Sequence, residues 1–85
     1  MTLQSKIHEY LIGVLGLPST IDVDTPLIKN GHLDSFNIME LAMFLQDSFS
    51  LDLSAGDFAA DCVDNNFGSV TRIVSYLQKH GVAGF

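Results

Sequence analysis

The chain of 85 residues contains one cysteine and two prolines, and no apolar run approaches the ~20 residues that a membrane-spanning helix needs. Because Cys62 alone cannot form an internal disulfide, nothing in the sequence requires a secretory compartment. The opening residues Met-Thr-Leu-Gln-Ser-Lys also lack the basic-then-apolar order of a signal peptide. We therefore expect a cytoplasmic protein.

Basic residues are scarce as well. Ten acidic residues face four basic ones, for a formal net charge of −6, and no Lys or Arg occurs between Lys29 and Arg72. That gap contains the acidic residues Asp34, Glu40, Asp47, Asp52, Asp57, Asp61 and Asp64. Such a surface repels nucleic-acid phosphates and anionic membranes, so we exclude both partners and expect a basic protein partner.

The apolar content, 47% of the residues, is enough for a single packed core and argues against disorder. We expect one domain over residues 1–85, existing as a monomer. No segment alternates polar and apolar residues long enough to predict a sheet. The apolar positions instead recur at three- and four-residue spacing, which predicts an all-α fold.

Three main helices and one short helix are predicted. The first begins after the cap Thr2, ends at Gly16-Leu17-Pro18, and buries the stripe Leu3, Ile7, Tyr10, Leu11, Val14 and Leu15. The second, from Ser35 to about Phe49, is capped by Asp34 and buries Ile38, Leu41, Ala42, Leu45 and Phe49. Between them, residues 17–34 form a long loop held to the core by Ile21, Val23, Leu27, Ile28 and Leu33.

The C-terminal third is predicted to hold the remaining two helices. The short one covers Ser54–Ala60, with Ser54 as its cap and Phe58 inward, and residues 61–68 form a turn. The last opens at Ser69, buries Val70, Ile73, Val74 and Leu77, and ends at Lys79-His80-Gly81. The predicted fold class is a small four-helix bundle.

Residues 31–36, Gly-His-Leu-Asp-Ser-Phe, place the hydroxyl of Ser35 at a helix start, at the end of the long loop. Local chemistry leaves two interpretations open, since serine and aspartate are common at helix starts for structural reasons alone. The wider pattern favours a function. Asp34-Ser35-Phe36, followed by Ile38, Met39-Glu40-Leu41 and Phe49, resembles the Asp-Ser-Leu motif and second helix of acyl and peptidyl carrier proteins.

The resemblance extends over nearly the whole chain, because the segments around Asp24-Thr25-Pro26-Leu27 and from Phe67-Gly68-Ser69-Val70 to Tyr76-Leu77 fall in family order. It implies that Ser35 is the attachment site of 4′-phosphopantetheine, transferred from coenzyme A by a phosphopantetheinyl transferase. The arm would carry acyl or aminoacyl groups as thioesters to loading and processing enzymes. The protein itself would be a carrier, not an enzyme.

The resemblance also implies a partner surface on the second helix, made of Asp34, Phe36, Met39, Glu40, Met43 and Asp47. Exposed methionine suits a surface that accepts several partners, although partial burial in the core is an equal alternative for Phe36, Met39 and Met43. The helix carries neutral Asn37, Gln46 and Ser48 where fatty-acid carriers often have acids, and Phe36 replaces the usual leucine. An aromatic residue there resembles D-alanyl carriers and some carriers of specialised metabolism. We therefore favour a specialised pathway, polyketide or nonribosomal, and keep a D-alanyl carrier and a fatty-acid carrier as alternatives.

Other candidate sites are weaker. His32 lies three residues before Ser35, but no nucleophile elbow accompanies the pair, so we expect a loop histidine and no catalytic residue. Asp22-Val23-Asp24 begins like a calcium loop that Pro26 then breaks, and Cys62 is expected to be half-buried, so no metal site is predicted. An alternative from another class is an unmodified acidic adaptor that binds a basic partner through residues 34–64.

Overall fold

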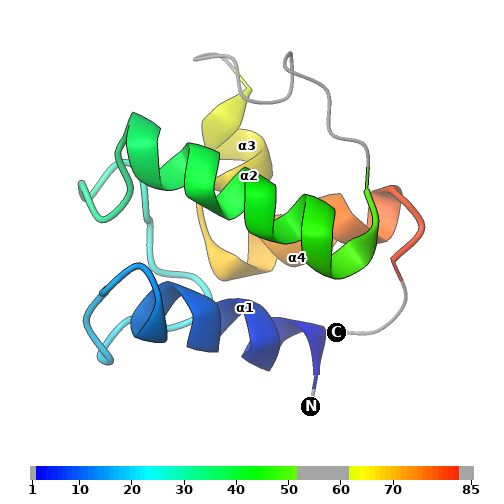
Figure 1. Ribbon diagram of the computed structural model, residues 1–85. Coiled ribbons are helices and arrows are strands. Elements are labelled where there is room, and N and C mark those ends of the chain that lie inside the picture. Colours follow the sequence, from blue (N-terminus) through cyan, green and yellow to red (C-terminus); the bar gives the residue numbers. More distant parts are fainter. Residues whose placement is uncertain (1, 52–61, 83–85) are drawn as a thin grey trace.

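The computed structural model describes residues 2–51 and 62–82, and in these ranges all regular structure is helical (Figure 1). Its helices are α1 (Leu3–Gly13), α2 (Ser35–Phe49), α3 (Val63–Phe67) and α4 (Val70–Lys79). The predicted all-α fold and its three longer helices are confirmed in these ranges, whereas the short helix α3 lies where a turn was predicted. Helices α1 and α2 run in opposite directions, with α4 behind them. No helix in the described ranges is long and apolar enough to cross a membrane.

Helix α1 begins as predicted and ends earlier than predicted. The Thr2 hydroxyl accepts a hydrogen bond from the Ser5 N–H at 3.0 Å, and Leu3, Ile7 and Leu11 are buried. The predicted stripe is wrong at Val14, whose side chain is 65% exposed. Val14 still has helical backbone angles, and its N–H donates to the Tyr10 carbonyl oxygen at 2.9 Å, but it caps the end of α1 and the core does not extend over its side chain.

Aromatic contacts between α1 and α2 set the rotation of α2 about its axis. The Tyr10 and Phe44 rings stack with centroids 3.8 Å apart, and the Tyr10 hydroxyl donates to the Glu40 carbonyl oxygen at 3.2 Å. The Phe49 ring meets Phe44 edge-on. With these residues facing α1, Leu41 and Leu45 point into the core and the opposite face of α2 is left to solvent.

Helix α3 corrects the predicted turn over residues 61–68. Residues 63–67 are helical, with Val63 and Phe67 four positions apart on the same face and Phe67 fully buried. The Asp-Asn-Asn run between them favours a turn locally, but burial of the Phe67 ring outweighs that preference. The predicted helix Ser54–Ala60, with Ser54 and Phe58, lies outside the described residues.

Helix α4 follows the prediction closely. The Ser69 hydroxyl accepts from the Arg72 N–H at 3.2 Å, and Val70, Ile73, Val74 and Leu77 are buried. Tyr76 is buried too, which the apolar stripe did not include. The helix ends at Lys79, and Gly81 adopts φ = 89°, a left-handed conformation that favours glycine.

The long loop is pinned to the core, as predicted. The Leu27 N–H donates to the Gly68 carbonyl oxygen at 2.7 Å, and the Thr71 N–H donates to the Val23 carbonyl oxygen at 2.9 Å. The core joins loop and helix residues in one cluster: Leu3, Ile7, Leu11, Leu17, Ile21, Leu27, Leu33, Leu41, Leu45, Phe67, Val70, Ile73, Val74, Tyr76 and Leu77. The loop therefore delivers the chain to the start of α2 in a fixed position.

Candidate functional site

Ser35 is the first residue of α2, and its side chain is exposed. The capping role belongs to its neighbour. Asp34 Oδ1 accepts from the Asn37 N–H at 2.8 Å, and the Asn37 side-chain oxygen accepts from the Asp34 N–H at 3.4 Å, a reciprocal capping box. Because Asp34 and not Ser35 makes the capping hydrogen bond, the exposed Ser35 hydroxyl remains accessible to a reagent or an enzyme.

The segment before Ser35 is anchored to the core. Leu33 is buried, and its N–H donates to the Leu27 carbonyl oxygen at 2.9 Å. A turn precedes it in which the Gly31 N–H donates to the Ile28 carbonyl oxygen at 3.0 Å, with Gly31 at φ = 77°. His32 is half-buried in this turn. Ser35 is thus held by an anchored turn on one side and a capped helix on the other.

A cleft of about 720 Å³ opens directly beside Ser35. Its walls come from the turn before α2, from α2 itself and from α3, and most of the side chains are apolar. The residues that line it from α2 and α3 include Ser35, Ile38, Met39, Met43, Gln46 and Val63. An apolar cleft that begins at an exposed hydroxyl can shelter a hydrophobic group attached to that hydroxyl.

The outer face of α2 is apolar and exposed beside the cleft. Phe36, Met39 and Met43 are 70%, 66% and 62% exposed, so their alternative placement in the core is excluded. Large hydrophobic side chains gathered on one helix face are typical of a docking surface. We call Phe36, Met39 and Met43 the apolar face of α2.

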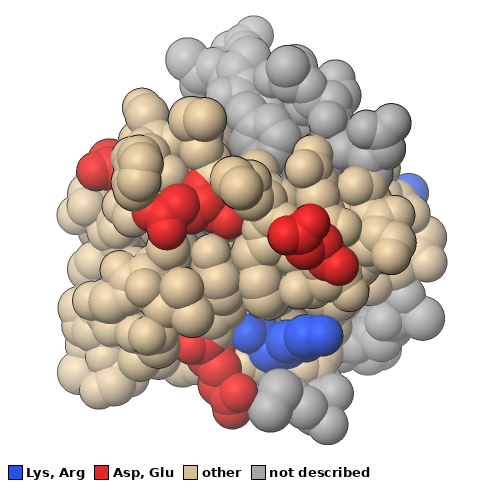
Figure 2. All heavy atoms as spheres, viewed as in Figure 1, with Lys and Arg blue, Asp and Glu red and all other residues tan. Residues whose placement is uncertain are grey.

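Acidic groups flank this face and do not cover it. Figure 2 shows them as separate red areas over α2 with uncharged surface between them. Asp34 and Asp47 are exposed, whereas Glu40 is half-buried. Burial raises the pKa of Tyr10, and the nearby Glu40 carboxylate raises it further. The face therefore offers a negative field to an approaching partner and an apolar contact once it arrives.

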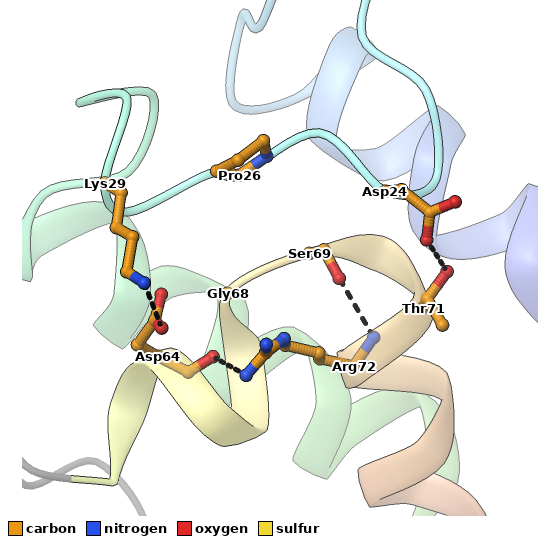
Figure 3. A pocket seen from close by; sticks show the side chains of 8 residues that line it. All are labelled: Asp24, Pro26, Lys29, Asp64, Gly68, Ser69, Thr71 and Arg72. Carbon is orange, nitrogen blue, oxygen red and sulfur yellow. Dashed lines mark hydrogen bonds and ion pairs between the residues drawn. The ribbon is translucent and has the colours of Figure 1, made fainter.

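A second hollow, of about 250 Å³, lies between the long loop, α3 and the start of α4 (Figure 3). Lys29 Nζ lies 3.6 Å from Asp64 Oδ2, and Arg72 Nη1 donates to the Asp64 carbonyl oxygen at 3.4 Å and to Asn65 Oδ1 at 3.2 Å. These contacts tie α3 to the loop and to α4. Since Val63 belongs to α3 and lines the cleft, they also position one wall of the cleft.

The sequence predicted Ser35 at the helix start and Asp34 as the cap, and it left open whether the apolar face of α2 is exposed. It did not predict the cleft or the contacts around Asp64. The cleft joins Val63 to residues of α2 and the loop, and no local pattern signals that approach. Cys62 is half-buried, as predicted, and directly precedes α3. Asp22 forms a turn in which its carboxylate accepts from the Asp24 N–H at 2.9 Å. In the described ranges, no three His, Cys, Asp or Glu side chains gather as metal ligands would.

Comparisons with known proteins bear on the same region. A family model described as "Phosphopantetheine attachment site" matches residues 5–65. The acyl carrier protein of Chlamydia trachomatis serovar L2 is 26% identical over 81 residues, covering 94% of this chain and 97% of that protein. The acyl carrier protein of Bdellovibrio bacteriovorus is 26% identical over 84 residues, covering 98% of this chain and 100% of that protein. No solved structure matches the chain.

Proposed function

This chain belongs to the phosphopantetheine attachment family, the family of acyl carrier proteins, and on that basis we propose that Ser35 carries its 4′-phosphopantetheine. That group is the covalent cofactor of the family, and its terminal thiol holds an acyl or aminoacyl group as a thioester. The observation that carries the assignment is the position of Ser35, exposed at the start of a capped helix and at the mouth of an apolar cleft.

The site fits the chemistry of the group. Phosphopantetheine joins a serine through a phosphodiester, which is an anion, and the first turn of α2 offers free backbone amides and the positive end of the helix dipole. Asp34 engages the Asn37 N–H and leaves the other first-turn amides available. A phosphopantetheinyl transferase supplies the group from coenzyme A. The carrier needs only to present the Ser35 hydroxyl.

The cleft supports a sheltering role for the cargo. Ile38, Met39, Met43 and Val63 give it apolar walls, so an acyl chain would leave water on entering it. A thioester drawn towards these walls meets less water and is hydrolysed more slowly. No residue of this chain is assigned a catalytic role, and partner enzymes carry out the bond-making steps.

The apolar face of α2 and the acids beside it support a docking role. The net charge of −6 steers basic enzymes to the protein, while contact with Phe36, Met39 and Met43 decides which enzyme remains bound. The interface includes Asp34, Glu40 and Asp47. Its partners are the transferase and the enzymes that load and process the cargo.

The sparse acids of α2 favour a specialised pathway, polyketide or nonribosomal, over fatty-acid synthesis, with D-alanyl transfer as the alternative. Asn37, Gln46 and Ser48 are uncharged, and Phe36 presents an aromatic ring directly after Ser35. We further propose that residues 1–85 act as one monomeric carrier domain in the cytoplasm.

Mass measurement tests the attachment. The purified chain is incubated with coenzyme A, Mg²⁺ and a broad-specificity phosphopantetheinyl transferase, and its intact mass is recorded. One phosphopantetheine adduct is expected on the wild type and on Ser48→Ala, an exposed serine of the same helix, and none on Ser35→Ala. A folded wild type without an adduct would instead favour the acidic adaptor for a basic partner.

A further inference from the structure

Gln46 has a polar side chain, whereas the α2 residues that line the cleft between Ser35 and Gln46 are apolar. It lines the same cleft as Ser35 but lies eleven residues later, about 16 Å along the helix axis. Between them, Ile38, Met39 and Met43 present apolar side chains to the cleft. Along α2, the cleft lining is therefore polar at Ser35, apolar in the middle and polar again at the Gln46 carboxamide.

The Gln46 carboxamide is available for a ligand. Its backbone carbonyl oxygen accepts from the N–H groups of Ser50 and Leu51, whereas no residue within 2–51 or 62–82 hydrogen-bonds with its side chain. The residue is half-buried. An amide offers two donors and one acceptor oxygen, and covering it with hydrocarbon alone leaves these groups without partners, which is unfavourable.

We propose that Gln46 makes the cleft selective for acyl groups that bear a hydroxyl or keto oxygen over saturated chains of equal length. This inference rests on the attachment of the arm to Ser35. A saturated chain fills the apolar middle but covers the carboxamide without bonding to it. A chain with one oxygen at that depth donates to or accepts from the amide and still packs its carbons against Ile38 and Met43.

The test compares two cargoes that differ by one oxygen. Wild type is loaded by the transferase from octanoyl-coenzyme A and from 3-hydroxyoctanoyl-coenzyme A; in each reaction the Ser35 oxygen replaces the pyrophosphate oxygen on phosphorus, and 3′,5′-ADP leaves. The hydrolysis half-life of each protein-bound thioester is divided by that of the same acyl-pantetheine free in solution. The quotient is a protection factor that removes the intrinsic lability of each thioester.

The decisive quantity is the ratio of the two protection factors, hydroxylated over saturated. In Gln46→Met, which keeps the length of the side chain and removes the amide, this ratio falls about fivefold, the factor that corresponds to one net hydrogen bond. Gln4→Met is the matched control, because Gln4 lies on α1 outside the cleft, and it leaves the ratio unchanged.

Three outcomes overturn the proposal. If the ratio of protection factors is the same in Gln46→Met and in the wild type, Gln46 does not provide the selectivity. The Gln46 side-chain NH₂ resonances are compared with those of the protein without the arm. If the arm alone shifts them as much as the acylated arm does, the hydrogen bond belongs to the arm's own amides. Failure of the mass adduct to form refutes the attachment at Ser35 as well, whereas an adduct with an unchanged ratio refutes the selectivity alone.

Discussion

Gly68 joins α3 to α4, and any side chain at this position is expected to destabilise the fold. A Cβ atom at this position would overlap the Asp64 carbonyl oxygen and lie 2.7 Å from Asp64 Oδ1. The backbone oxygen cannot move without α3 moving. The conformation itself is ordinary, with φ = −74°, so the demand for glycine comes from close approach and not from backbone strain.

The cost of Gly68→Ala follows from the contacts that must give way. Overpacking a rigid site costs about 1–3 kcal/mol. The shift also strains the Gly68 N–H to Asp64 oxygen bond, 3.0 Å, and the Leu27 N–H to Gly68 oxygen bond, 2.7 Å, each worth about 1 kcal/mol. We expect the free energy of unfolding to fall by about 2–4 kcal/mol, which for a domain of this size lowers Tm by about 10 °C or more.

Urea unfolding followed by circular dichroism measures this change. Gly13→Ala is the matched control, because a Cβ at Gly13 meets nothing within 4 Å, and it should leave stability unchanged or raise it by up to about 1 kcal/mol. A Gly68→Ala variant that unfolds within about 0.5 kcal/mol of the wild type would refute the close approach of Gly68 to Asp64.

Three further predictions address the docking face, the loop turn and the position of α3. Met39→Glu and Met43→Glu should slow modification by the transferase while changing stability by less than about 0.5 kcal/mol, and unfolding of both would contradict their exposure. The Asp24 N–H and the Thr25 hydroxyl donate to the Asp22 carboxylate and lower its pKa. The stability that this carboxylate contributes is therefore present above its unfolded pKa and is lost as pH falls through the lower folded pKa. Asp22→Asn should flatten that part of the curve of unfolding free energy against pH. Arg72→Met should destabilise the fold by about 1 kcal/mol, because it removes the hydrogen bonds to the Asp64 carbonyl oxygen and to Asn65. Hydrolysis of a loaded thioester should become faster, because α3 forms one wall of the cleft. An unchanged hydrolysis rate would show that Arg72 does not position this wall.

The features that the sequence predicts correctly are those set by near neighbours in the chain. The predicted caps Thr2 and Asp34 each receive a hydrogen bond from the N–H three residues later, so a local pattern suffices to find them. Ser69, where the last helix was predicted to open, caps α4 in the same way. The exposure of Met39 and Met43 is consistent with their four-residue spacing from Ser35, once the core face of α2 is known.

The features that it misses depend on contacts between distant segments. The helical state of residues 63–67 is stabilised by burial of Phe67 against the core, which overrides the turn preference of Asp64 and the two asparagines. The cleft forms only when Val63 of α3 approaches Ile38 and Met43 of α2. The sequence alone therefore does not distinguish Gln46 from a surface glutamine, and only the structure places it in the cleft.

We propose that the arm is attached at the exposed hydroxyl of Ser35. Proteolysis of the transferase-treated protein, followed by mass spectrometry of the peptide that contains residues 31–36, tests it most directly. We expect the phosphopantetheine mass and its fragment ions to map to Ser35, and we expect Ser35→Ala to yield an unmodified peptide from an equally well-folded protein. An adduct on another serine, or none on the folded wild type, would contradict it.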